Sequence, residues 1–229
     1  MFSTSEILKI EKELEEPYKI ERYRGENVFY GIDKETNERL TFKVIPNLFE
    51  SYIHINNILQ EIQECSEINH ENVIQLINLK TEKHFDDFQS LIIVFQRMDT
   101  SLFDILQTNQ ELSTDHRRFF IYQILRGLKY LHSANVILKN LNPYNIMLDA
   151  NCDLKILTLG HSTDNRVKCY VAPETLLEAT RELTPSVDIW SVGCILYELI
   201  MRKRLFPGIN TIDQLRIIIE TIGKPDDDD

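Results

Sequence analysis

The chain has 229 residues, of which 43% are hydrophobic, so it can bury the core of one large domain or two small ones. Its net charge of −11 argues against a general binder of nucleic acid or of anionic membranes. The four cysteines are scattered and no signal peptide or membrane span is evident, so we expect a cytoplasmic, or else nuclear, protein without a zinc site.

The N-terminal part of the chain predicts a strand-rich region behind a short acidic segment. Residues 1–16 contain the capping-box pattern Ser3-Thr4-Ser5-Glu6, and we expect them to form an N-terminal extension. Residues 18–44 predict strands joined by a polar turn at 33–38. Helical spacing of apolar side chains follows over residues 51–66, and two more apolar strands are expected at 73–79 and 91–95.

The rest of the chain predicts mainly helices. Ser113 is expected to cap a long helix, and Thr184-Pro185 to open another after a hairpin that turns at Asp149–Cys152. The helix after Ser113 has an apolar stripe that we expect to be its inner face, namely Ile121, Ile124, Leu125, Leu128 and Leu131. A last helix carries Ile212, Leu215, Ile219 and Ile222, and the aspartates at 226–229 predict a solvated acidic tail.

Two motifs around the hairpin resemble the catalytic centre of the eukaryotic protein kinases. The first reads Leu138-Lys139-Asn140-Leu141-Asn142-Pro143-Tyr144-Asn145, and the second reads Thr158-Leu159-Gly160. The family pattern at these places is H-R-D-L-K-P-x-N and then D-F-G. Two further strings, Arg126–Asn135 and Asp188–Leu196, are similar to the mitogen-activated protein kinases in particular.

The resemblance covers nearly the whole chain and implies an α+β fold, the bilobal protein kinase fold with a truncated C-terminal lobe. It implies an N-terminal lobe over residues 17–98 and a C-terminal lobe with the acidic tail over residues 99–229. The strings His70–Ile74 and Ile212–Leu215 are similar to the stress-activated branch, whose activation motif is Thr-Gly-Tyr. In the matching segment Lys168 cannot be phosphorylated, and Tyr170 is expected to pack rather than to be modified.

The matched catalytic positions lack the charged groups of the family. Asn140 stands at the position of the base, and its neutral amide accepts no proton at pH 7. Thr158 stands where the resemblance places the main metal ligand, and Asn142 where it places the phosphate-contacting lysine. Asn145, the second metal ligand of the motif, is retained. We expect no catalytic residue and no metal site here.

The nucleotide pocket implied by the resemblance is partly retained. The glycine positions of its phosphate-binding loop hold Glu21, Tyr23 and Glu26, and a single Gly25 lies off register. The strand lysine and its helix partner are matched by Lys43 and Glu61, for which we expect an ion pair. The other pocket positions, together with Asn145, are Val28, Thr41, Phe95, Met98 and Met147.

These substitutions favour a pseudokinase that acts by binding proteins of a kinase cascade and is not itself an enzyme. Two alternatives stay open: an atypical ATP-dependent serine/threonine kinase of weak activity, and a degraded copy without function. No cofactor is expected, and any ATP binding would be weak and independent of metal. We expect no nucleic-acid or membrane partner, and self-association through apolar surface of the C-terminal lobe.

Overall fold

The computed structural model forms two compact units, each described here by itself. Unit 1 comprises residues 1–69 and 74–98, and unit 2 comprises residues 70–73 and 99–229. The structure describes residues 10, 14, 17–25, 27–49, 52–81, 90–158, 165–177 and 183–224. Most of the expected N-terminal extension (1–16) and the acidic tail (226–229) therefore lie outside the described residues.

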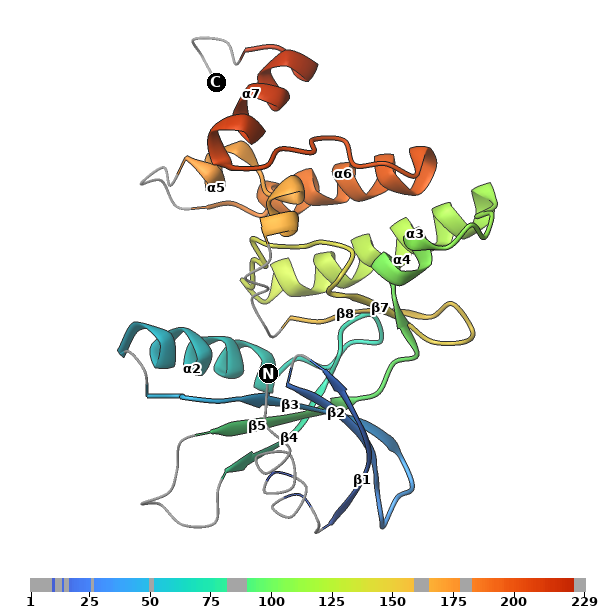
Figure 1. The fold of residues 1–229 in the computed structure, drawn as a ribbon, viewed down its shortest axis with the longest axis vertical. Coiled ribbons are helices and arrows are strands. Elements are labelled where there is room, and N and C mark those ends of the chain that lie inside the picture. Colours follow the sequence, from blue (N-terminus) through green and yellow to red (C-terminus); the bar gives the residue numbers. More distant parts are fainter. Residues whose placement is uncertain are drawn as a thin grey trace. The chain divides into compact units, whose positions relative to one another are not determined.

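Unit 1 is built on a five-stranded antiparallel sheet with one helix (Figure 1). The strand order is β1-β2-β3-β5-β4, so the predicted strands are confirmed. The predicted strand at 73–79 begins later, at Leu76, because Val73 instead forms a parallel bridge to Ile156 in unit 2. The elements are β1 (Tyr18–Gly25), β2 (Val28–Asp33), β3 (Arg39–Ile45), α2 (Tyr52–Ser66), β4 (Leu76–Thr81) and β5 (Leu91–Gln96).

One face of this sheet holds the core of unit 1. Phe29, Leu40 and Phe42 are at most 1% exposed and belong to one cluster with Val44 and Val94. These residues alternate along their strands, as a sheet with one covered face requires. Ile10 and Leu14, one helical turn apart, are buried in the same cluster. The opposite sheet face therefore carries the intervening side chains of β2, β3 and β5.

Unit 2 is mainly helical and includes a small sheet with the order β6-β7-β8 (Figure 1). The predicted hairpin is confirmed: Asp149 N–H donates to Asp153 O, and Asp149 Oδ1 accepts the N–H groups of Asn151 and Asp153. The elements are β6 (Thr100–Ser101), α3 (Leu102–Gln107), α4 (Thr114–Ser133), β7 (Ile146–Leu148), β8 (Leu154–Ile156), the 3₁₀ helix η2 (Asn165–Tyr170), α5 (Pro173–Leu176), α6 (Ser186–Met201) and α7 (Thr211–Ile222).

The three long helices were predicted, but not all of their apolar faces are buried. Ser113 caps α4 by accepting the His116 N–H, as expected. Leu125, predicted on the inner face of α4, is 42% exposed, and Ile121 is only half-buried. Periodicity identifies an apolar stripe but not what covers it, and here Phe120 and Gln123 take the inner positions. Among the described residues, none of the helices has the length and hydropathy of a membrane span.

Candidate functional site

Four of the predicted nucleotide-pocket residues lie on one face of the unit 1 sheet. The strand register pairs Val28 with Lys43 and Thr41 with Phe95, and these positions alternate with the core residues of the opposite face. Phe95 is 4% exposed, whereas Val28, Thr41 and Lys43 are half-buried. The register therefore gathers an aromatic ring, two small side chains and one ammonium group on this face.

The remaining pocket residues of unit 1 lie at its edges. Glu61 is half-buried on α2, and Met98, at the end of the unit, is 4% exposed. The structure places Lys43 on β3 and Glu61 on α2, and the ion pair between them stays a prediction.

In the hairpin β1–β2, the residues that stand at the family's glycine positions make contacts of their own. Tyr23 pairs with Phe29 across the strands, and their rings lie 4.9 Å apart, so Tyr23 packs toward the core face. Glu21 is neutralised by an ion pair of 3.1 Å with Arg97. Gly25 adopts a φ of +102°, which favours glycine, at the start of the turn. Glu26 lies outside the described residues.

In unit 2, one buried carboxylate holds the loop before Asn140. Asp188, in the first turn of α6, is 0% exposed and accepts the backbone N–H groups of Leu138 and Lys139 at 3.0 and 2.9 Å. His132 Nε2 lies 2.8 Å from the same carboxylate. Asp188 fixes the backbone where Lys139 takes a left-handed φ of 63°. Sequence reasoning missed this role, although Asp188 is one of only two carboxylates in the apolar α6 sequence, which is a signal for a buried, satisfied charge.

Beyond Asp188, three asparagines close the loop with their own amides. Asn142 is 1% exposed, and its Nδ2 donates to Asn140 O at 2.7 Å. Asn145 Oδ1 accepts the Asn142 N–H at 3.0 Å, while Asn145 Nδ2 donates to Asn140 O at 2.9 Å. The Tyr144 N–H donates in turn to Asn142 Oδ1. We call Asn140, Asn142 and Asn145 the amide loop. The side chains of Asn142 and Asn145 stabilise the shape of the loop.

Thr158 lies beside this loop because a backbone hydrogen bond joins them. The Leu157 N–H donates to Asn145 O at 2.7 Å, directly after β8. Thr158 and Met147, on β7, are both half-buried. The structure thus brings together Asn140, Asn142, Asn145 and Thr158 in unit 2, as their motif positions predicted.

The chemistry of this group is neutral. Three amides and one hydroxyl supply oxygens, whereas Mg²⁺ prefers carboxylate oxygens. The Asn145 oxygen already accepts the Asn142 N–H. These four side chains therefore do not by themselves fit a divalent cation.

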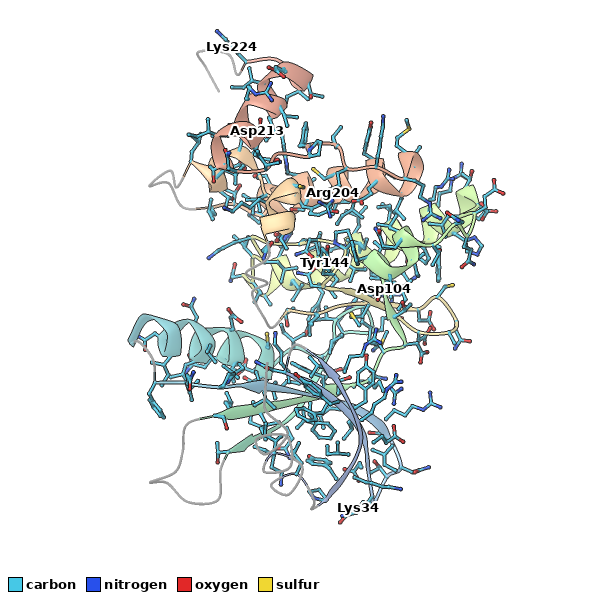
Figure 2. All side chains as sticks on the ribbon, viewed as in Figure 1. Lys34, Asp104, Tyr144, Arg204, Asp213 and Lys224 are labelled. Atoms are coloured by element: carbon cyan, nitrogen blue, oxygen red, sulfur yellow. The ribbon has the colours of Figure 1, made fainter. Side chains whose placement is uncertain are left out.

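A second buried network, in unit 2, fixes Tyr170. The Tyr170 hydroxyl donates to Glu198 Oε2 at 2.5 Å, and the two residues are 1% and 5% exposed. Burial and this hydrogen bond raise the pKa of Tyr170 far above its usual range. Arg204, labelled in Figure 2, lies near Cys169 of the same segment. The prediction that Tyr170 packs into the large lobe is confirmed.

Comparisons with known proteins agree with this fold. Residues 24–227 match the model of the protein kinase domain. The chain is 45% identical to mitogen-activated protein kinase 11 of Arabidopsis thaliana over 85% of this chain and 55% of that protein. It is 44% identical to mitogen-activated protein kinase 4 of the same plant, over 86% of this chain and 56% of that protein. The chain thus spans just over half the length of these curated relatives.

The comparisons also correct one expectation. The sequence analysis expected no enzyme, but the relatives are named as kinases, including mitogen-activated protein kinase 6 of rice at 41% identity. The expectation that the chain is not an enzyme is therefore wrong. That expectation gave more weight to the three substituted positions, Asn140, Asn142 and Thr158, than to the similarity of the whole chain. With its α+β architecture and its match over residues 24–227, the chain belongs to the protein kinase family.

Proposed function

We propose that the chain acts in signalling as a protein serine/threonine kinase of the mitogen-activated type, with a phosphotransfer rate limited by its neutral amide loop. The family match and the identity of more than 40% to named kinases support the reaction class. The single observation that supports the reduced rate is the hydrogen-bonded amide loop beside Thr158. In this loop Asn140 presents an amide where the family presents the carboxylate of its base, and Asn142 presents an amide where the family presents a lysine.

The loss of the base is compatible with slow transfer. Phosphoryl transfer proceeds through a loose transition state, so catalysis depends mostly on positioning and on electrostatic stabilisation. A missing general base typically costs about 10² to 10⁴ in rate, which slows the reaction without abolishing it. In this proposal the Asn140 amide orients the acceptor hydroxyl.

We further propose that the chain binds ATP weakly and without need for magnesium. Lys43 and the apolar residues Val28 and Phe95 share one sheet face, which supports an adenine and phosphate contact there. The neutral group at Asn145 and Thr158 offers no charged metal ligand, which supports independence from magnesium. A thermal-shift titration with ATP, in magnesium and then in EDTA, measures this: the shifts should be small and equal. A shift that requires magnesium contradicts it.

The partners in this proposal are proteins of a kinase cascade and a second copy of the chain. Exposed apolar side chains on α6 and α7, among them Ile200 and Ile212, support self-association. The strings at 70–74 and 212–215 support the Thr-Gly-Tyr branch, and the scattered, largely buried cysteines support a reducing compartment such as the cytoplasm or nucleus.

An ATP-dependent labelling assay tests the reaction class. Purified protein with labelled ATP and a generic substrate should transfer phosphate slowly but above background. Lys43→Ala should lose the signal, because Lys43 is the proposed phosphate contact, and this loss excludes a contaminating kinase. Arg39→Ala, on the same strand, is the control for removal of a cation. Equal labelling by wild type and Lys43→Ala overturns the proposal.

A further inference from the structure

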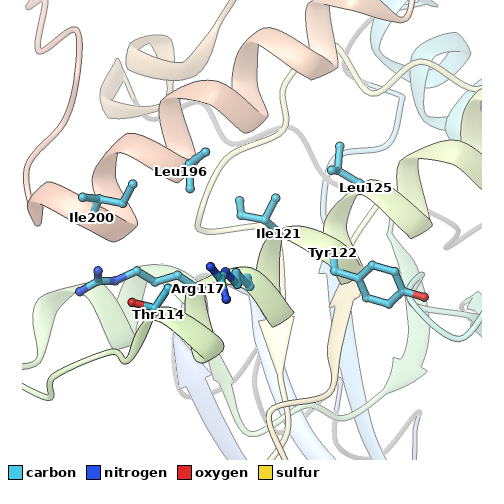
Figure 3. Close-up of a pocket in the computed structure, with 8 residues that line it drawn as sticks. Thr114, Arg117, Ile121, Tyr122, Leu125, Leu196 and Ile200 are labelled. Carbon is cyan, nitrogen blue, oxygen red and sulfur yellow. The ribbon is translucent and has the colours of Figure 1, made fainter.

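A groove on unit 2 lies outside the candidate site. α4 and α6 pack side by side, and between them the structure has a cavity of about 530 Å³ (Figure 3). Ile121 and Leu125 of α4, and Leu196 and Ile200 of α6, supply its apolar lining. Leu125 and Ile200 are 42% and 50% exposed. We call this the α4–α6 groove.

The charged groups that line the groove are both arginines. Arg117 Nε is buried and has no hydrogen-bond partner among the described residues. Arg118 forms an ion pair with Asp115 at 3.8 Å, but both side chains are more than three-quarters exposed, so this pair is weak. The groove therefore suits an apolar surface that carries acidic groups at its edge. The chain itself has a net charge of −11, so a second copy can supply such groups.

Helix α7 presents such a surface. Ile212, Ile219 and Ile222 follow one another at helical spacing and are 82%, 42% and 60% exposed. Arg216, four residues after Ile212 and three before Ile219, borders this stripe and forms ion pairs with Asp213 and Glu220. Four aspartates follow in the sequence at 226–229 and add negative charge after the helix. α7 is thus an amphipathic helix whose apolar stripe lacks cover within the described residues of its own unit.

The buried face of α7 fixes the helix to its own unit. Gln214 is 0% exposed and accepts the Gly208 N–H at 2.9 Å, and Ile218 is 4% exposed. α7 contacts α5 and η2 through this part of the fold. It would have to leave these contacts to reach the groove of its own chain. A second copy can reach the groove without that cost.

We propose that α7 of one copy binds the α4–α6 groove of a second copy. The isoleucine stripe fills the apolar groove, as amphipathic helices do in helix-in-groove recognition, and the negative charge of the sequence after α7 complements Arg117 and Arg118. Reciprocal exchange of α7 closes a two-fold dimer. This inference rests on the self-association proposed above and assigns it two different surfaces.

Complementation between two variants tests the proposal by light scattering coupled to size exclusion. Ile200→Glu damages the groove, and Ile212→Glu damages the helix. Both positions are at least half exposed, so the fold should survive. Wild type should dimerise, and each variant alone should dimerise about tenfold more weakly or worse. An equimolar mixture should regain a heterodimer, because one intact groove meets one intact helix. Ile77→Glu, on β4 of unit 1, should leave the dimer unchanged.

The outcomes distinguish the groove assignment from the broader proposal of self-association. A monomeric wild type overturns both self-association and the groove assignment, and leaves the groove to another partner. A wild-type dimer that survives both variants, or a mixture that forms no heterodimer, overturns the groove assignment alone. A labelled peptide of residues 209–229 provides a second readout: it should bind full-length Ile212→Glu protein, and binding to Ile200→Glu should be about tenfold weaker or worse. Equal binding overturns the proposal.

Discussion

Tyr170, at the end of η2, and Glu198, on α6, form a buried polar pair of side chains. The phenol is the donor that the Glu198 carboxylate needs in this apolar surrounding. Ser191, on the same helix as Glu198, donates to Tyr170 O at 2.8 Å. The aromatic ring and its backbone are therefore both tied to α6. This arrangement leaves Tyr170 unavailable for modification while the fold is intact.

Tyr170→Phe should destabilise the protein by about 1–3 kcal/mol, because it leaves a buried carboxylate without its donor. The same change in a Glu198→Gln background should cost less, since a neutral amide loses less when its partner is removed. Urea unfolding of the four proteins measures this coupling. Tyr122→Phe, whose ring is 59% exposed, is the control and should be nearly neutral. Equal costs of Tyr170→Phe in both backgrounds contradict the account.

Stability should fall at alkaline pH because buried groups, among them Cys194 and Tyr170, have raised pKa values and keep their protons in the fold. Burial, and then the neighbouring Cys169, raise the pKa of Cys194 from 9.0 to about 12. The pKa of Tyr170 is also raised from its ordinary value of 10.0. In the unfolded chain both groups release protons at their ordinary values. Their contribution is therefore complete below about pH 9 and is lost as pH rises toward the folded values.

Thermal melting between pH 7 and pH 11 measures this loss. The melting temperature of wild type should fall above about pH 9, the ordinary pKa of the thiol. Cys194→Ala should lower stability at neutral pH but make the alkaline fall shallower, because one of the groups with a raised pKa is gone. An unchanged slope in Cys194→Ala contradicts the role assigned to its thiol.

At the scale of elements, α4 and α6 each contain one glycine, and the two face different surroundings. A Cβ at Gly127 of α4 would lie 3.0 Å from Asn72 O and 3.0 Å from Ile156 Cδ1. Asn72 cannot withdraw easily, because it donates to Gln123 and to Leu154 O while its own oxygen accepts the Ile156 N–H. A Cβ at Gly193 of α6 would meet nothing within 4 Å.

The two glycines therefore predict alanine substitutions of opposite sign. Gly193→Ala should stabilise the protein by up to about 1 kcal/mol, since alanine is the better helix former and the site is open. Gly127→Ala should destabilise it, because backbone atoms must shift to admit the methyl group. The free energies of unfolding of wild type and the two variants, measured in parallel, test these opposite signs. Two changes of the same sign contradict the packing described for α4.

The sequence predicted the long elements well and the short ones poorly. α4, α6 and α7 have periodic stripes and recognisable starts, and they were found. α3 is only six residues long, too short for periodicity, and its one signal is the capping box of Ser101 and Asp104. The exposure of Leu125 and Ile212 was not predictable, because a stripe shows which side chains are apolar but not which neighbour covers them.

At the scale of the whole molecule, the motif order predicted the protein kinase fold, and the register then placed Val28, Thr41 and Lys43 on one sheet face. What the motifs could not supply is the interlocking of the amide loop. Its hydrogen bonds join side chains to backbone within a turn that Asp188 holds from α6. Taken one by one, the asparagines led to the prediction that the chain is not an enzyme. As one loop, they hold a fixed shape through neutral amides.

The rate of phosphate transfer in Asn140→Asp/Thr158→Asp protein tests this account most directly. Restoring both carboxylates, while the buried Asn142 keeps the loop closed, should raise transfer from ATP by about 10² or more and make it depend on magnesium. Asn151→Asp, on an exposed turn of unit 2, adds a carboxylate elsewhere and should change nothing. Single-turnover labelling of the three proteins, with and without magnesium, gives the comparison. Wild type as fast as the double variant would contradict the claim that the neutral loop limits the rate.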